Sequence, residues 1–259
     1  DVAQKHIPFE NCNIVVVGNS EIVDKLLPFD SDNNIEFLDP YGNPKEKMRP
    51  SDLSGIEVVN NYLMKVTESK TMDEVKSKAK GVKSYKKSTA LSMAGMPGTL
   101  SLVEMYEAPK TQAMKMEMMG QVFQSGYLKG NKGYEQNAQT GKKNLTKEKI
   151  KERKKSFGLF PELNYEKYDV QLEAIGIESI GKEQFYVVKI VNGEKEEYNY
   201  YDASNFLLSK KTSIESSPDG GTVENTVEYG DYKNVNGFLI PHSQNRSIGQ
   251  MSFSGTISN

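Results

Sequence analysis

The chain has 259 residues, with 33 lysines and arginines against 35 aspartates and glutamates, so its net charge is -2. This balance gives no overall basic field and argues against a nucleic-acid-binding protein. No apolar run approaches the roughly 18 residues that a membrane-spanning helix needs. Cys12 is the single cysteine, which excludes an internal disulfide and a multi-cysteine metal site.

Residues 1–45 are predicted to form a small β-α-β unit. The continuous apolar run 14–17 is typical of a strand buried on both faces, and Pro28 ends the helix that follows it. Residues 35–38 are predicted as the second strand. A unit of this size cannot bury both faces of a sheet, so we expect it to complete a larger domain upstream. Residues 45–51 are predicted to be a linker.

Two helices are predicted next, each from a capping box in which side chains satisfy free backbone N–H groups. Ser54 pairs with Glu57 in the first box, and Thr71 pairs with Glu74 in the second. The first helix carries an apolar stripe at the spacing of a helix packed on a sheet. The stripe consists of Ile56, Val59, Tyr62, Leu63 and Val66.

From about residue 85 the apolar period changes from 3.6 to 2, which indicates β-strands. The dipeptides Asn192-Gly193, Asp219-Gly220 and Asn236-Gly237 are hairpin signals between such runs. Short strands joined by consecutive hairpin turns predict an antiparallel meander, either open or closed into a barrel. The fold class is therefore α+β, mainly antiparallel β.

The residues that catalysis would need are missing from the chain. His6 and His242 are the two histidines, and neither belongs to a zinc-peptidase motif. The turn at Gly18 lacks the further glycines of a phosphate-binding loop. We therefore expect no catalytic residue, no metal and no cofactor in this chain.

A group of methionines is the main candidate for a binding surface. Methionine is flexible and polarizable, so it suits surfaces that accommodate varied apolar ligands, although the same residues could simply fill the core. We expect the following residues to line an apolar cavity: Leu91, Met93, Met105, Met114, Met116, Met118, Tyr186 and Val188.

A lysine-rich helix is predicted at about 146–157, where it interrupts the strands and would cover the mouth or concave face of the sheet as a lid. The lid is expected to place apolar residues toward the cavity, namely Ile150, Phe157, Leu159 and Phe160. Its many lysines favour either a solvated outer face or a surface that meets anionic lipid or an acidic partner.

Two stretches resemble known families. The segment 13–44 resembles the end of the last domain of bacterial insulinase/pitrilysin-type zinc peptidases. The rest resembles the LolA/LolB type of lipoprotein carrier in its segments 134–137, 200–202 with 207–208, 229–233 and 236–242. This second resemblance implies an incomplete, half-open β barrel wrapped around helices, with an apolar cavity that receives acyl chains. The peptidase metal motif is not in this chain, so no catalytic residue carries over.

The resemblance sets the functional expectations. Residues 1–45 would be the tail of an upstream peptidase domain, and residues 46–259 a LolA/LolB-like domain in the periplasm or cell envelope. This domain would be a non-catalytic module that holds a lipid, an acyl chain or an apolar peptide segment. The alternative is a structural or substrate-positioning domain of the peptidase, with a filled core and no ligand.

Overall fold

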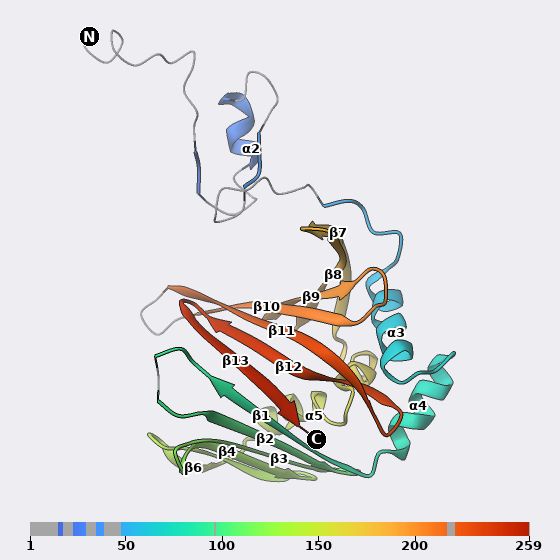
Figure 1. The fold of residues 1–259 in the computed structure, drawn as a ribbon. Helices are drawn as coiled ribbons and strands as arrows, with labels where there is room; N and C mark the ends of the chain where they lie inside the picture. Colours follow the sequence, from blue (N-terminus) through green and yellow to red (C-terminus); the bar gives the residue numbers. More distant parts are fainter. Residues whose placement is uncertain are drawn as a thin grey trace, which may run out of the picture. The chain divides into compact units, whose positions relative to one another are not determined.

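A computed structural model describes residues 15–17, 23–29, 35–38, 48–95, 97–216 and 221–258. The chain divides into two compact units, Asp1–Lys47 and Met48–Asn259. Figure 1 shows the second unit as a strongly curved sheet with helices at one end.

The described part of the first unit contains the short helix α2 (Val23–Leu26) and a 3-10 turn, η3 (Leu27–Phe29). Residues 15–17 and 35–37 adopt no strand, and Val17 is almost fully exposed. The structure therefore does not confirm the predicted β-α-β unit, and the rest of that prediction lies outside the described residues.

The second unit begins with two helices, α3 (Gly55–Val66) and α4 (Met72–Gly81). The Ser54 hydroxyl accepts from the backbone N–H of Glu57, and the Glu57 carboxylate accepts from Ser54, which completes the predicted capping box. Thr71 likewise accepts from the backbone of Glu74. The Glu74 carboxylate, however, accepts from the N–H of Lys70 and not from that of Thr71, so the second box is only half formed.

In the described residues one antiparallel sheet of 13 strands follows, as the alternating pattern predicts. Its first six strands are β1 (Ser84–Ser92), β2 (Leu100–Glu107), β3 (Thr111–Met118), β4 (Gln121–Lys129), β5 (Lys132–Asn137) and β6 (Gly141–Asn144). The other seven are β7 (Gln171–Ile180), β8 (Glu183–Asn192), β9 (Lys195–Asp202), β10 (Leu208–Ser216), β11 (Thr222–Val235), β12 (Phe238–Ile248) and β13 (Met251–Ser258).

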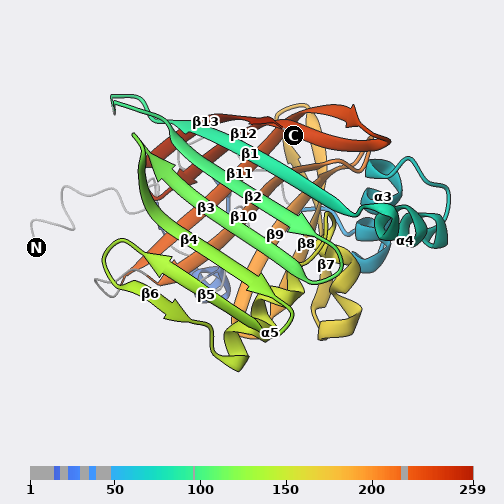
Figure 2. The same cartoon turned by 90° about the horizontal axis from the view of Figure 1, so that it is seen from below.

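The strand order is β6-β5-β4-β3-β2-β1-β13-β12-β11-β10-β9-β8-β7. Two meanders therefore join where the first strand pairs with the last, with Thr89 opposite Ile257. The sheet edges β6 and β7 are not paired with each other, so the sheet stays open. Figure 2 shows how it curves back, with β1–β4 crossing in front of β9–β12.

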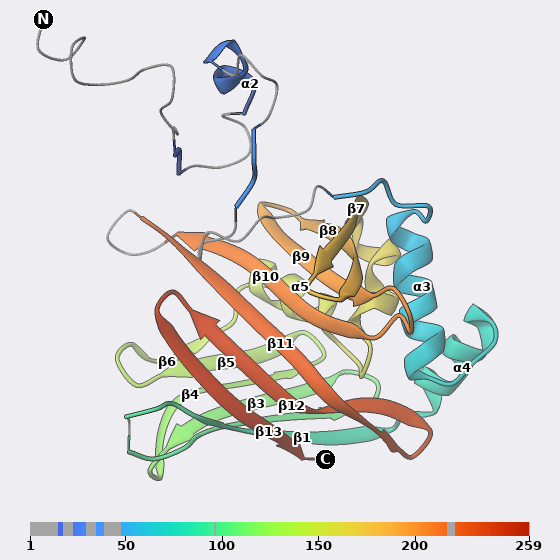
Figure 3. The same cartoon turned by 45° about the horizontal axis from the view of Figure 1, so that its top comes forward.

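The chain between the two edges is helical. It contains α5 (Lys147–Lys155) and two 3-10 turns, η4 (Pro161–Asn164) and η5 (Glu166–Tyr168). Figures 1 and 3 both show α5 between the two halves of the curved sheet. The helix that the sequence predicts at 146–157 thus lies on the concave side.

The main core forms where α3 packs against β7, β8 and β12. Val58, Leu63 and Val66 of α3 are at most 1% exposed and share one apolar cluster with Val188 and Tyr201 of the sheet. The predicted stripe is correct except at its first position, because Ile56 is 51% exposed while Val58 is buried.

Candidate functional site: an apolar concave face

The predicted methionines alternate along β3, and the strand register shows what stands beside them. Leu100 lies opposite Met118, and Leu102 lies opposite Met116. Directly opposed residues project from the same face of a sheet, and so do residues two apart along a strand. Five side chains thus form one surface, here called the methionine face: Leu100, Leu102, Met114, Met116 and Met118.

The methionine face is on the concave side of the sheet. Met114 lies opposite Gly126 of β4. A Cβ atom built on Gly126 would meet the guanidinium of Arg153, which belongs to α5. Because α5 lies inside the curve of the sheet, Met114 and the side chains that share its face point inward too.

This face is only partly covered by the protein itself. All five residues of the methionine face are half-buried, whereas the neighbouring Leu91 on β1 is 2% exposed. The apolar side chain that α5 contributes, Ile150, packs against Leu128 and Leu145 at the next strands. Apolar surface inside the curve therefore remains accessible.

Two of the predicted lining residues lie elsewhere. Met105 is opposite Ala113, so it projects from the convex face, and it is 41% exposed. The prediction that Met105 lines the cavity is wrong, because strand alternation turns it away from its neighbours Glu104 and Tyr106. Met93 lies just beyond the end of β1 and is half-buried there.

Tyr186 and Val188 are on the concave side, but at the end that α3 occupies. Val188 is fully buried and Tyr186 is 8% exposed, both in the cluster that α3 completes. The Tyr186 hydroxyl donates to Asp52, 3.0 Å away. These two residues are covered by the protein's own side chains. The prediction that they line a cavity is therefore wrong, because they belong to the packed core.

The predicted lid residues bridge the two halves of the sheet. The Phe157 ring contacts the edge of Tyr106 on β2, with ring centroids 6.4 Å apart. Phe160 is 5% exposed and contacts Phe238 on β12 at 5.7 Å. Leu159 is half-buried against the main core cluster. The segment therefore crosses the interior, with its apolar side chains directed into the fold.

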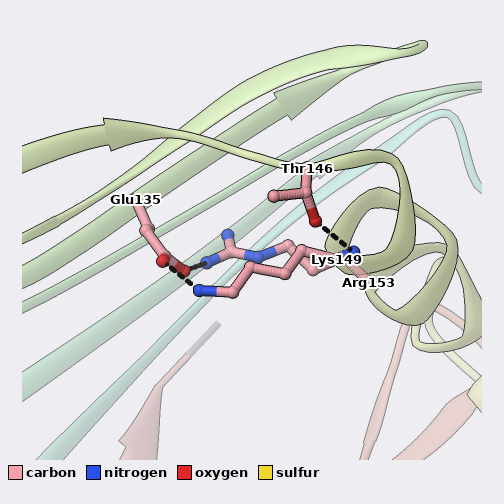
Figure 4. Close-up of polar contacts among 4 residues, drawn as sticks. All are labelled: Glu135, Thr146, Lys149 and Arg153. Atoms are coloured by element: carbon pink, nitrogen blue, oxygen red, sulfur yellow. Dashed lines mark hydrogen bonds and ion pairs between the residues drawn. The ribbon is translucent and has the colours of Figure 1, made fainter.

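Charged contacts hold α5 on the sheet, as Figure 4 shows. Lys149 and Arg153 both pair with the carboxylate of Glu135 on β5. These two cations lower the pKa of Glu135, with the hydrogen bond from Lys149 as the largest cause. The helix begins at Thr146, whose hydroxyl accepts from the backbone N–H of Lys149.

Further lysines of α5 also contact the sheet. Lys154 donates to Asn131, 2.5 Å away, and Lys155 donates to Asn192 on β8. Some of the lysines that sequence predicts on an outer surface thus bind the helix to the sheet. Lys147 and Lys151 remain exposed.

A polar cluster that the sequence does not predict lies on the same side, with Glu162 and Asn199 buried and Lys211 and Glu197 partly exposed. Lys211 of β10 lies opposite Asn199 of β9 and pairs with Glu197 at 3.3 Å. Burial alone would lower the pKa of Lys211, but Glu197 and Glu162, together with nearby tyrosines, hold it well above its usual value. Glu162 of η4 is 8% exposed, and burial raises the pKa of its carboxyl.

Two acceptor atoms in this cluster have no donor. Oε2 of Glu162 and Oδ1 of Asn199 are buried and accept no hydrogen bond from any described group. A buried polar atom without a partner costs about 1–3 kcal/mol. Sequence alone gave no signal for this cluster, because its members lie far apart in the chain and are joined only by strand pairing and by η4.

Two surface cavities lie away from the methionine face. One, of about 400 Å³, is next to α3 and is lined in part by Met64, Phe206 and Leu239. The other, of about 490 Å³, lies over β7–β12 and is lined in part by Phe185, Tyr200 and Lys210. Neither contains a residue that sequence predicts for the cavity lining or the lid.

The described ranges contain neither a candidate metal site nor a helix that could span a membrane. No group of three or more His, Cys, Asp or Glu side chains there is arranged to hold a metal ion. In that same part of the chain, no helix combines the length and the apolar character needed to cross a bilayer.

Comparison with solved structures agrees with this architecture. A LolA superfamily protein from Nitrosomonas europaea has a TM-score of 0.50 and 12% identity, over 80% of this chain and 92% of that one. The fold is LolA-like. A DUF1329 family protein from Desulfovibrio piger has a TM-score of 0.47 and 10% identity, over 78% of this chain and 91% of that one.

Comparisons of the sequence itself add nothing to this result. No family model matches the chain, and no curated protein matches it. The LolA-like half of the expected resemblance is thus supported at the level of fold, whereas the peptidase half is not supported.

Proposed function

We propose that this chain is a non-catalytic carrier or binding module that holds an apolar ligand, an acyl chain or an apolar peptide segment, against its methionine face. The observation that carries the proposal is the methionine face itself: five apolar side chains on the concave side, all left half-buried. The LolA-like fold supports the same role. Burying an acyl chain contributes about 0.8 kcal/mol per CH₂ group, so partial coverage suffices for measurable affinity.

The position of the lid segment is further evidence for a ligand site inside the curved sheet. Phe157 and Phe160 place aromatic rings against opposite halves of the sheet. Ion pairs, which water can replace, dock α5 at Glu135. A ligand could therefore enter along β3 if α5 shifted, without disturbing the core around α3.

Displacement of a fluorescent fatty acid tests the proposal. Met116→Glu places a charge in the centre of the methionine face and should weaken probe binding at least tenfold. The matched control is Met105→Glu, the same substitution on the convex face of the neighbouring strand, which should leave binding unchanged. Equal behaviour of the two variants, or no binding by the wild-type protein, would contradict the proposal.

A second candidate is a structural or substrate-positioning domain without a ligand, and the fully packed core around Val188 favours it. In this case the chain would be the C-terminal part of a zinc-peptidase-type protein of the periplasm or cell envelope. Support for that parent comes only from the resemblance of segment 13–44. Deleting residues 48–259 from the parent should then alter its folding or peptidase activity, while the probe would not bind.

A further inference from the structure

The charges of the chain are strongly segregated along the sequence. Residues 128–155, from the end of β4 to the end of α5, carry ten lysines and arginines against three glutamates, a net charge of +7. The rest of the chain carries 23 lysines and arginines against 32 aspartates and glutamates, a net charge of -9. A chain whose net charge is only -2 thus concentrates its positive charge in one segment.

These cations gather at one border of the sheet, where Figure 2 shows β5, β6 and α5. Six exposed lysines of this border are here called the basic face: Lys129, Lys132, Lys142, Lys143, Lys147 and Lys151. Within the described part of the chain, none of these six forms an ion pair with a carboxylate.

The strand register joins the lysines of the turn to those of the edge strand. Lys129 and Lys132 lie directly opposite each other beside the turn between β4 and β5. Tyr134 projects from the same face of β5 as Lys132, and the ammonium of Lys142 on β6 lies 3.9 Å from the centre of its ring. The basic face is therefore continuous from this turn to β6.

Glu135 connects the edge strand to α5. It lies opposite Lys143 on β6 and also binds Lys149 and Arg153 of the helix. One carboxylate thus faces three cations, and all three lower its pKa, with the hydrogen bond from Lys149 as the largest cause. Positive charge remains in excess where β6 meets α5.

Several of these lysines stand where the fold itself disfavours a cation. Like charges directly opposite each other on paired strands, as at Lys129 and Lys132, are destabilising. Lys147 is in the first turn of α5, where the helix dipole favours an acid, and Lys151 follows it four residues later. Lysines on an edge strand discourage pairing with other chains, but this accounts only for the two on β6. The remaining lysines call for an anionic partner outside the fold.

The form of the basic face suits a bilayer better than a folded protein. The two surface cavities described above lie beside α3 and over β7–β12, on other elements. Flexible lysines spread over a turn, a strand and a helix match a diffuse layer of anionic headgroups, which attracts clusters of about 4–8 cations. A folded partner is instead bound mainly through a few residues seated in pockets.

The position of α5 agrees with this choice. This helix would shift to admit a ligand to the methionine face, and a bilayer is a source of apolar chains. A basic face around α5 would turn the open border of the sheet toward that source. This step rests on the proposed function.

We propose that the basic face docks this protein on an anionic lipid bilayer by attraction between its lysines and the headgroups. Docking needs no insertion of the chain into the hydrocarbon layer, so it is reversible and sensitive to salt.

Sedimentation of the full chain with lipid vesicles tests the inference. One set of vesicles is phosphatidylcholine alone, and the other contains about 30% phosphatidylglycerol as the anionic lipid. We expect binding to the anionic vesicles only, at about 0.1 M salt. It should weaken at least tenfold at about 1 M salt, where the screening length falls from about 10 Å to about 3 Å.

A double charge reversal, Lys132→Glu with Lys147→Glu, should weaken binding to the anionic vesicles at least tenfold. Both changes place an acid where the fold favours one, opposite Lys129 and in the first turn of α5, so the melting temperature should not fall. The matched control is Lys76→Glu with Lys80→Glu. It makes the same change of charge at exposed lysines of α4 and should keep vesicle binding.

Three results would overturn the docking proposal: equal binding to neutral and anionic vesicles, no binding to either, or equal loss in the two double variants. Binding to polyglutamate but not to anionic vesicles would also overturn it and assign the basic face to an acidic protein.

The fluorescent fatty acid, measured without vesicles, keeps this proposal separate from the proposed function. If the probe binds while anionic vesicles do not, docking fails and the proposed function stands. If vesicles bind while the probe does not, the proposed function fails and the docking surface stands.

Discussion

The guanidinium of Arg153 occupies the space that a side chain at residue 126 would need, since a Cβ built on Gly126 would lie 2.4 Å from its Nη1 atom. Because residue 126 of β4 has no side chain, the guanidinium of Arg153 on α5 can lie directly against this strand. The same guanidinium reaches Glu135, 3.6 Å away, so this one residue contacts two strands.

Gly126→Ala should therefore loosen α5 without unfolding the sheet. The methyl group would displace the end of Arg153 and weaken its ion pair, a loss of about 1 kcal/mol at a partly exposed pair. Hydrogen exchange should accelerate several-fold in residues 147–155 and stay unchanged in β8. The control is Gly81→Ala at the end of α4, where a Cβ meets nothing within 4 Å. Equal exchange in both variants would contradict this account of α5 docking.

Leu63→Ala should lower the free energy of unfolding by about 2–5 kcal/mol, because the side chain is 1% exposed and its removal leaves a cavity in the core. Ile56→Ala on the same helix is the control. Ile56 is 51% exposed, so its loss should be below about 1 kcal/mol. Urea denaturation of both variants measures the difference, and comparable losses would show that α3 does not pack as described.

Ser54→Ala should cost about 1 kcal/mol, because it leaves the first N–H groups of α3 without the hydroxyl acceptor at the helix start. Thr71→Ala removes the equivalent hydroxyl from the start of α4. This helix has one buried residue, whereas α3 has six. We expect the thermal midpoint to fall more for Ser54→Ala than for Thr71→Ala. The reverse order would mean that α4 matters more to global stability than its packing indicates.

Glu162 should make stability depend on pH. Burial raises the pKa of its carboxyl above the ordinary value of 4.5, so the folded protein binds this proton more tightly than the unfolded chain does. Stability contributed by the protonated form is then complete below pH 4.5 and is lost as pH rises through the raised pKa. Lys211, whose pKa is raised, stays charged throughout this window.

Glu162→Gln cannot ionise, so its stability relative to wild type should increase by about 1.4 kcal/mol for each pH unit between the two pKa values. Urea denaturation at pH 4.5 and pH 7.5 measures this change. Glu166→Gln, at an exposed position of η5, is the control and should follow the wild-type curve. A constant difference between Glu162→Gln and wild type across this range would show that the carboxyl is not buried as described.

Sequence reasoning found the features that depend on local order. Alternation predicted the antiparallel sheet, the Ser54 capping box predicted the start of α3, and lysine density beside Thr146 located α5. Sequence does not show which face of the sheet a strand residue occupies, because this depends on the register between paired strands. Sequence places Met105 with Met114 because both are methionines in strands, but the face of a residue can be assigned only once its strand is paired, and pairing puts the two on opposite faces.

The polar cluster shows a different limit. Glu162, Asn199 and Lys211 come from η4 and from two strands, and no spacing in the chain brings them together. Their meeting depends on the path of the segment between β6 and β7 through the curve of the sheet. The prediction that Tyr186 and Val188 line the cavity fails for the same reason, since only the position of α3 shows that their end of the fold is filled.

The pairing of β1 with β13 has a consequence for synthesis. The seam between the two meanders is closed by β13, the last strand of the sheet in chain order, so each half keeps one long unpaired edge until β13 has been synthesised. Such edges invite pairing with other chains. Deletion of the eight residues of β13 would leave two half-sheets with no strand to join them.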